Sequence, residues 1–154
     1  QLEEKQIGEA MTADDFVITA TDVSFMSQED FSDIYAFEKE MFKEAECIMV
    51  TVNIKNMSEE KQRVTLEGFT LTSQAWTTCT APDKYMAVNE KWNSEQYQSG
   101  SIYIESGEER KLILPFLLVK NGFTQKQWEH VKERNYELVL SLYPVKKQIK
   151  LKCV

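Results

Sequence analysis

The chain of 154 residues is poor in the residue types that build metal centres and nucleophilic active sites. It has one histidine, His130, and three widely spaced cysteines, Cys47, Cys79 and Cys153. A lone histidine without paired cysteines lacks the ligand pattern of a zinc site and the partners of a catalytic triad. An odd number of cysteines at wide spacing is no disulfide framework, so we expect reduced, partly buried thiols. The sequence therefore predicts a protein that is not an enzyme and that has no catalytic residue, cofactor or resident metal.

Glycine, long apolar runs and positive charge are also scarce. The five glycines are scattered and form no phosphate-binding loop. No run of about 18 apolar residues occurs, so a membrane would be reached only through an anchor upstream. Lysine and arginine number 18 against 25 acidic residues, a formal charge of −7, which argues against a nucleic-acid partner because phosphate binding needs basic surface. Residues 1–46 hold 13 acidic and 3 basic residues, which favours a solvated acidic face.

The clearest positive signal is the stretch AECIMVTVNIKN, residues 45–56. Its β-branched residues Ile48, Val50, Val52 and Ile54 alternate with polar neighbours. Because side chains alternate faces along a strand, this pattern is typical of a half-buried antiparallel strand around which a sheet can be built.

Other segments repeat the strand pattern with local breaks. Residues 15–25 change register partway, which indicates a bulge. Residues 63–72 carry a kink at Gly68, and Pro115 within 112–119 places that strand at a sheet edge or at a bulge. We also expect strands at Ile102–Ile104, 136–142 and 145–153, the last with outward lysines that protect an edge. A capping box at Thr124–Gln127 predicts one short helix.

Two segments near the start have weaker patterns. Residues 1–13 are polar and aperiodic, which predicts a flexible tether, so that the folded domain would span 14–154. Residues 27–46 have a helical stripe and high helix propensity, which favours a helix over a hairpin or long loop. About seven strands with turns between them make an all-β, antiparallel β-sandwich with one or two short helices the expected fold.

Residues 73–100 form a polar, aperiodic region that is rich in aromatic side chains. Trp76, Trp92 and Tyr97 are candidate ligand contacts, because exposed rings can stack on sugars or anchor a protein partner. The alternative is that the tryptophans cover one end of the core. The pair Glu108–Glu109 could suggest acid–base chemistry, but a structural role in a polar turn is favoured.

Three stretches together resemble a known family: VTVNIKNMSEE, IESGEERKLILPFLL and YELVLSLYPVKKQIKLK. They are similar to segments of immunoglobulin-like domains in secreted and lipid-anchored proteins of Gram-positive bacteria, within the immunoprotective extracellular antigen superfamily. The acidic segment 27–46 and the TQKQWEHVKER insertion depart from that pattern, and no binding residue carries over.

The resemblance implies an immunoglobulin-like fold and an extracellular location, with a secretion signal and a lipid-attached cysteine upstream of Gln1. The expected function is a non-enzymatic, cell-surface binding or structural module with an unidentified protein or glycan partner at the envelope. The alternative is a carbohydrate-binding module that uses the loop aromatics Trp76, Trp92 and Tyr97.

Overall fold

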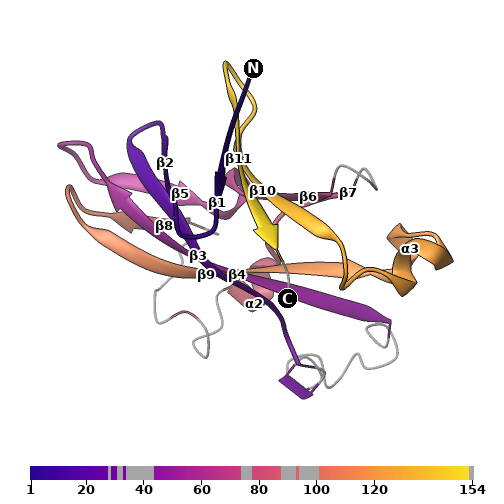
Figure 1. Ribbon diagram of the computed structural model, residues 1–154. Coiled ribbons are helices and arrows are strands. Elements are labelled where there is room, and N and C mark those ends of the chain that lie inside the picture. Colours follow the sequence, from indigo (N-terminus) through magenta and orange to yellow (C-terminus); the bar gives the residue numbers. More distant parts are fainter. Residues whose placement is uncertain are drawn as a thin grey trace.

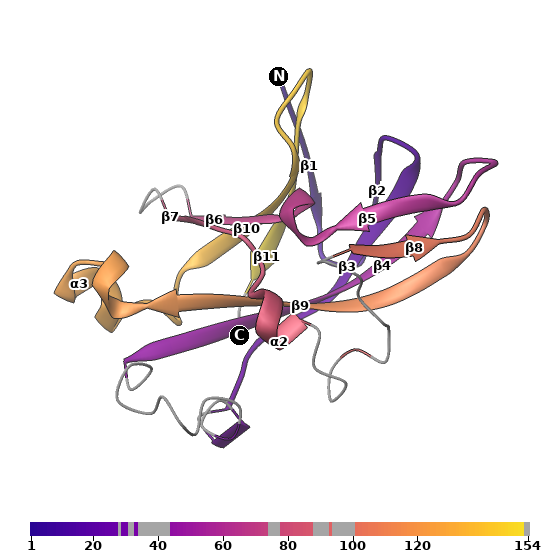
Figure 2. The same ribbon diagram turned by 180° about the vertical axis from the view of Figure 1, so that it is seen from behind.

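The computed structural model describes residues 1–27, 29–30, 33, 44–73, 78–87, 93 and 101–152. Within these ranges the chain forms eleven strands, the short α-helices α2 and α3, helical residues at 29–30 and 33, and two 3₁₀ turns (Figures 1 and 2). The strands are β1 (Leu2–Gln6), β2 (Ala10–Ala13), β3 (Phe16–Phe25), β4 (Ala45–Asn56), β5 (Gln62–Thr65), β6 (Thr70–Ser73), β7 (Thr78–Thr80), β8 (Ser101–Ile104), β9 (Glu109–Val119), β10 (Asn135–Ser141) and β11 (Lys146–Lys152). The helical elements are η2 (Leu66–Gly68), α2 (Lys84–Ala87), η3 (Lys120–Gly122) and α3 (Gln125–Glu129).

These strands form a β-sandwich, as the sequence predicted. The first sheet has the order β1-β11-β10-β6-β7, the second β2-β3-β4-β9, and a third pairs β5 with β8. One hydrophobic core is shared by all three sheets, and its buried side chains include Ile54 of the second sheet, Leu138 of the first and Ile104 of the third. The chain has four strands more than the seven expected: β1 and β2 lie in the N-terminus, the predicted strand 63–72 divides into β5 and β6, and β7 lies within the region 73–100.

Strand β4 is the centre of the second sheet and confirms the strongest sequence prediction. It pairs antiparallel with β3 on one side and with β9 on the other. Ile48, Val50, Val52 and Ile54 are all fully buried in the core. The bulge expected in residues 15–25 is also present, because the β3–β4 register shifts between Ala20 and Asp22.

The predicted kink at Gly68 is a crossover between sheets. The segment leaves β5 in the third sheet, turns through η2 and enters β6 in the first sheet. Leu66 and Phe69 stay buried through the turn, so apolar side chains hold the crossover against the core. Glycine lowers strand propensity at this point, which is why the sequence indicated a break there.

Strand β9 lies at an edge of the second sheet, as its proline required. Its outer edge is covered by two polar groups: Asn93 donates to Ile113 O and accepts from Ile113 N–H at 2.9 and 2.7 Å, and the Asp83 N–H donates to Pro115 O at 2.8 Å. Because N–H and C=O of one residue point the same way in an antiparallel strand, the donor that Pro115 lacks would face this outer edge. The proline therefore removes no hydrogen bond from the ladder between β9 and β4.

The prediction that residues 1–13 are a flexible tether is wrong. β1 pairs parallel with β11, and β2 pairs antiparallel with β3, with Met11 almost completely buried. Opposite charges favour the β1–β11 pair, since Lys147 lies 3.9 Å from Glu3 and Lys150 lies 3.9 Å from Glu4. The folded domain thus includes residues assigned to the tether.

The lysines of β11 do not protect an edge, because β1 covers that side of the strand. Helix α3 has the predicted capping box: Gln127 N–H donates to Thr124 Oγ1 at 3.1 Å, and Thr124 N–H donates to Gln127 Oε1 at 2.8 Å. The helix expected in residues 27–46 lies mostly outside the described residues. Within the described part of the chain, no helix is long and apolar enough to cross a membrane.

Asn56, at the end of β4, is a fully buried polar residue that ties three segments together. Its side-chain amide donates to Glu60 O at 2.8 Å and to Ile104 O at 2.9 Å, while its side-chain oxygen accepts from Ser58 N–H at 2.9 Å. Both functions of the amide are therefore satisfied, which is the condition under which a buried polar group stabilises a fold.

We expect Asn56→Ala to lower the free energy of unfolding by about 2 kcal/mol, because it removes the side-chain donor to the buried Ile104 carbonyl and the amide contacts that hold the turn through Ser58 and Glu60. Asn56→Asp should be equally harmful although its size is the same, since a carboxylate cannot donate to two carbonyl oxygens. Asn53→Ala, on the half-buried side of the same strand, should cost less than about 1 kcal/mol. Urea unfolding measures all three; equal losses for Asn53→Ala and Asn56→Ala would contradict the assigned role.

Cys47 is a buried free thiol, as expected, in a small apolar cluster with Met26, Met86 and Ala45. Burial, followed by the negative charge of Asp83, raises the pKa of this thiol to about 12. The side chain of Cys79 and the whole of Cys153 lie outside the described residues.

In a Cys79→Ser/Cys153→Ser variant, Cys47 should not react with an aromatic disulfide reagent at pH 8 until the protein unfolds, because the thiolate is the reactive form. A folded-state pKa raised above the unfolded value of about 8.5 means that this group's contribution to stability is present below pH 8.5 and declines above it. Rapid modification of the folded variant, before any change in circular dichroism, would disprove the burial of this thiol.

Candidate functional site

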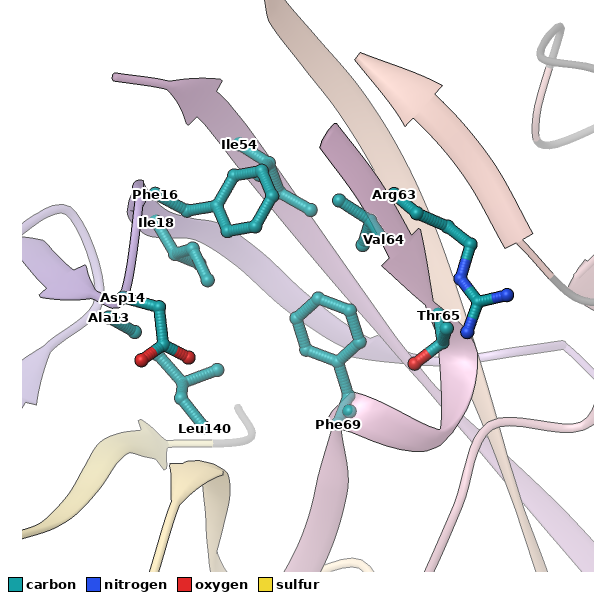
Figure 3. A pocket seen from close by; sticks show the side chains of 11 residues that line it. Ala13, Asp14, Phe16, Ile18, Ile54, Arg63, Val64, Thr65, Phe69 and Leu140 are labelled. Carbon is teal, nitrogen blue, oxygen red and sulfur yellow. The ribbon is translucent and has the colours of Figure 1, made fainter. Parts of the chain in front are cut away.

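The candidate site is an apolar pocket of about 190 Å³ where the second and third sheets meet the first (Figure 3). Its walls come from five strands and the crossover, so residues far apart in sequence converge here. The apolar side chains that line it are those of Phe16, Ile18, Ile54, Val64, Phe69 and Leu140. Binding pockets are typically concave and mainly apolar, with a few polar groups at defined places. This pocket has the same character, but its volume is only that of a single large side chain.

Two aromatic side chains, Phe16 and Phe69, form opposite parts of the pocket wall. Phe16 begins β3 and is partly buried, whereas Phe69 follows η2 and is buried at the junction of the crossover with β6. Figure 3 shows both rings facing the interior of the pocket, with Ile54 and Val64 behind them. Because these side chains are also part of the main core, the pocket is preformed by the fold.

Asp14 and Arg63 are the charged residues of the lining. They lie on opposite sides of the pocket, Asp14 near Leu140 and Arg63 beyond Val64 and Thr65 (Figure 3). Both residues are exposed, so their charges are solvated. The site thus has an apolar interior with a negative charge on one side and a positive charge on the other.

The position of Asp14 is fixed by a tight turn. Ala13 and Phe16 are paired across the β2–β3 hairpin, so Asp14 and Asp15 alone form its loop. Asp14 has a φ of 53°, a left-handed conformation that aspartate and asparagine tolerate better than other non-glycine residues. A loop of two aspartates between strands is the sequence signal that could have located this side of the pocket.

The sequence-predicted contacts Trp76, Trp92 and Tyr97 all lie outside the described residues, so the carbohydrate-binding interpretation stays a prediction. Of the other residues weighed from sequence, Glu108 has the structural role that was favoured. It accepts from the Glu105 N–H at 2.9 Å and from Arg110 Nε at 3.1 Å, and these contacts, the backbone one first, lower the pKa of its carboxyl group.

His130 caps the end of α3 with a half-exposed side chain, 2.7 Å from Glu133 Oε2. A second, polar hollow of about 380 Å³ lies here and includes Lys126 and Arg134 in its lining. In the described part of the chain, no group of three or more histidine, cysteine, aspartate and glutamate side chains is arranged to hold a metal ion.

Solved structures with the same architecture support the fold. The yjhA protein from Bacillus subtilis is similar over 96% of this chain and 99% of its own, at 16% identity and a TM-score of 0.57. An uncharacterised β-sandwich protein from Clostridium difficile matches over 99% and 97%, at 11% identity and a TM-score of 0.53. A putative lipoprotein from B. subtilis, ycdA, matches over 93% of this chain but 38% of its own, at 19% identity and a TM-score of 0.56.

At these identities the likeness shows the fold alone. No curated protein matches the chain. A family profile, however, matches residues 1–147, which includes the first two strands as well as the rest of the sandwich. The chain therefore belongs to the family described as the domain of unknown function DUF5028.

Proposed function

We propose that this domain is a non-enzymatic binding module of the cell envelope, held outside the cytoplasm by a lipid anchor upstream. The resemblance to immunoglobulin-like domains of Gram-positive surface proteins supports the location. So does the fold shared with ycdA, which is described as a putative lipoprotein. Stacking of a glycan on Trp76, Trp92 or Tyr97 remains part of this proposal as the alternative mode of binding.

The observation that carries the binding role is the apolar pocket between the sheets. Asp14 is the single carboxylate of its lining, and the interior is formed by rings and aliphatic side chains. Such walls gain free energy by burying an apolar group, at about 25 cal/mol per Å² removed from water. They offer no second carboxylate or imidazole with which Asp14 could share proton transfer, so binding is the chemistry that they favour.

The size and charges of the pocket define its occupant. A volume of about 190 Å³ accommodates one large apolar side chain and is small for a drug-sized ligand, whose pockets span roughly 300–1,000 Å³. Asp14 on one side favours a cation, and Arg63 on the other favours an anion. The partner is therefore a protein segment in which an aromatic or long aliphatic residue has a basic and an acidic neighbour, because opposite charges then meet across the interface.

We expect the probe peptide acetyl-Lys-Phe-Glu-amide to shift the amide NMR signals of Ile18, Val64 and Phe69 in a saturable way. Replacement of its phenylalanine by alanine should abolish the shifts, since the apolar contact supplies most of the affinity. Asp14→Asn and Arg63→Gln should each weaken binding by about threefold, the range of an exposed ion pair.

Asparagine also tolerates the left-handed conformation of Asp14, so Asp14→Asn leaves the turn intact. Asp22→Asn, an exposed substitution at the β3 bulge, is the matched control and should leave the dissociation constant unchanged. Shifts of equal size with the alanine peptide, or shifts confined to residues elsewhere, would refute the pocket as the binding site.

The location is tested separately by fractionation of cells that express the native gene. The protein should be found in the membrane fraction and be degraded when protease is added to intact cells whose wall has been removed. Extraction by detergent but not by high salt is expected, because an acyl chain binds by apolar burial rather than by charge. Recovery in the cytosolic fraction alone would disprove the proposed location.

A further inference from the structure

We propose that the turn of the β10–β11 hairpin is a membrane-contacting tip that lies on the lipid surface to which the domain is tethered. This inference rests on the proposed envelope location. Both ribbon views show the hairpin projecting from the body beside the first residue (Figures 1 and 2). The Lys146 N–H donates to the Gln1 carbonyl at 3.2 Å, which fixes the N-terminus to the base of this turn.

Exposed apolar side chains gather at this end of the molecule. Leu142 is 60% exposed and Tyr143 86% exposed, both in the hairpin turn. Leu2, 53% exposed, is paired with Lys146 at the start of the parallel β1–β11 ladder. Three of the five large hydrophobic residues exposed in the described part of the chain are therefore close in the fold, whereas isolated exposure is the ordinary case.

The tip continues into an apolar groove of about 430 Å³ on the neighbouring strands. Val139, Leu140, Leu142 and Tyr143 are the apolar residues of its lining, and Lys146 and Glu67 are the charged ones. A leucine and a tyrosine with an adjacent lysine match the interfacial layer of a bilayer, where an apolar body is buried while a phenol or ammonium group stays among the headgroups.

Position beside the N-terminus favours a lipid surface over a protein as the occupant. The ion pairs that the described residues form on β11 involve Lys147 and Lys150, which leaves the Lys146 ammonium group to contact a lipid phosphate beside Glu67 of the groove. An anchor attached upstream of Gln1 would hold the bilayer near the same end, and this raises the effective concentration of lipid at the tip. A contact too weak to bind a free protein firmly would then suffice to orient the tethered domain.

The test is flotation of the 154-residue chain, which carries no lipid, with vesicles of phosphatidylcholine and phosphatidylglycerol at millimolar lipid. Wild type should partition measurably, and Leu142→Ser/Tyr143→Ser should lower the partition coefficient about tenfold, because apolar area is lost. The matched control is Met57→Ser/Tyr103→Ser, which makes the same kind of change at two exposed sites elsewhere and should stay within about twofold of wild type.

Lys146→Gln should weaken partition to vesicles that contain phosphatidylglycerol and leave partition to pure phosphatidylcholine unchanged. No partition of wild type, or equal partition of the tip and control variants, would overturn the inference. A concentration-dependent dimer that is lost in the tip variant, measured by sedimentation without lipid, would assign the tip to self-association instead and likewise overturn it.

Because the chain in this assay has no anchor, its outcome is independent of cell fractionation. If the chain does not bind vesicles but the native protein is membrane-bound, the membrane-contacting role of the tip is refuted and the proposed location is not. If the native protein is cytosolic, the proposed function is refuted, whatever the result of the vesicle assay.

Discussion

The burial of one face of β4 is the constraint on which the other parts of this fold depend. Ile48, Val50, Val52 and Ile54 are removed completely from water, and at roughly 1.5–3 kcal/mol each their burial is among the largest favourable contributions in the domain. That burial requires strands on both sides of β4 and a second layer above it. β3 and β9 supply the first, and the sheet that contains β10 and β11 supplies the second.

The edge strands of a sandwich have backbone N–H and C=O groups that need hydrogen-bond partners. In this domain polar side chains supply some of these partners. Asn93 forms with Ile113 the same pair of hydrogen bonds that a neighbouring strand would form, at the edge where Pro115 has no N–H to offer. Asn56 closes the turn at the end of β4 in a comparable way. Exposed strand edges promote association between chains, so these amides contribute to specificity as well as to stability.

The features that the sequence predicted well are local, and those that it missed are long-range. The alternation in β4, the capping box of Thr124 and the edge position of Pro115 each follow from neighbouring residues and were confirmed. β1 was missed because four of its five residues are polar, and because its partner β11 lies about 140 residues away, so charge pairing across that distance leaves no local pattern. The pocket was missed for the same reason, since Phe16, Val64 and Leu140 come from different strands.

The two surfaces proposed here share one structural cause. β10 pairs with β6 only as far as Val139, and its register against β11 shifts between Val139 and Ser141. A bulge turns the strand, so that Leu140 faces the pocket, Ser141 still pairs with Lys147, and the residues after Ser141 form the projecting turn. Leu140 also lines the groove beside that turn.

The pocket and the groove of the tip thus share the side chain of Leu140. A partner bound against Leu140 would contact the strand that leads into Leu142 and Tyr143, the residues proposed to contact lipid. A domain oriented by its tip would consequently hold its pocket at a fixed height above the membrane, which favours a partner that is itself confined to that surface.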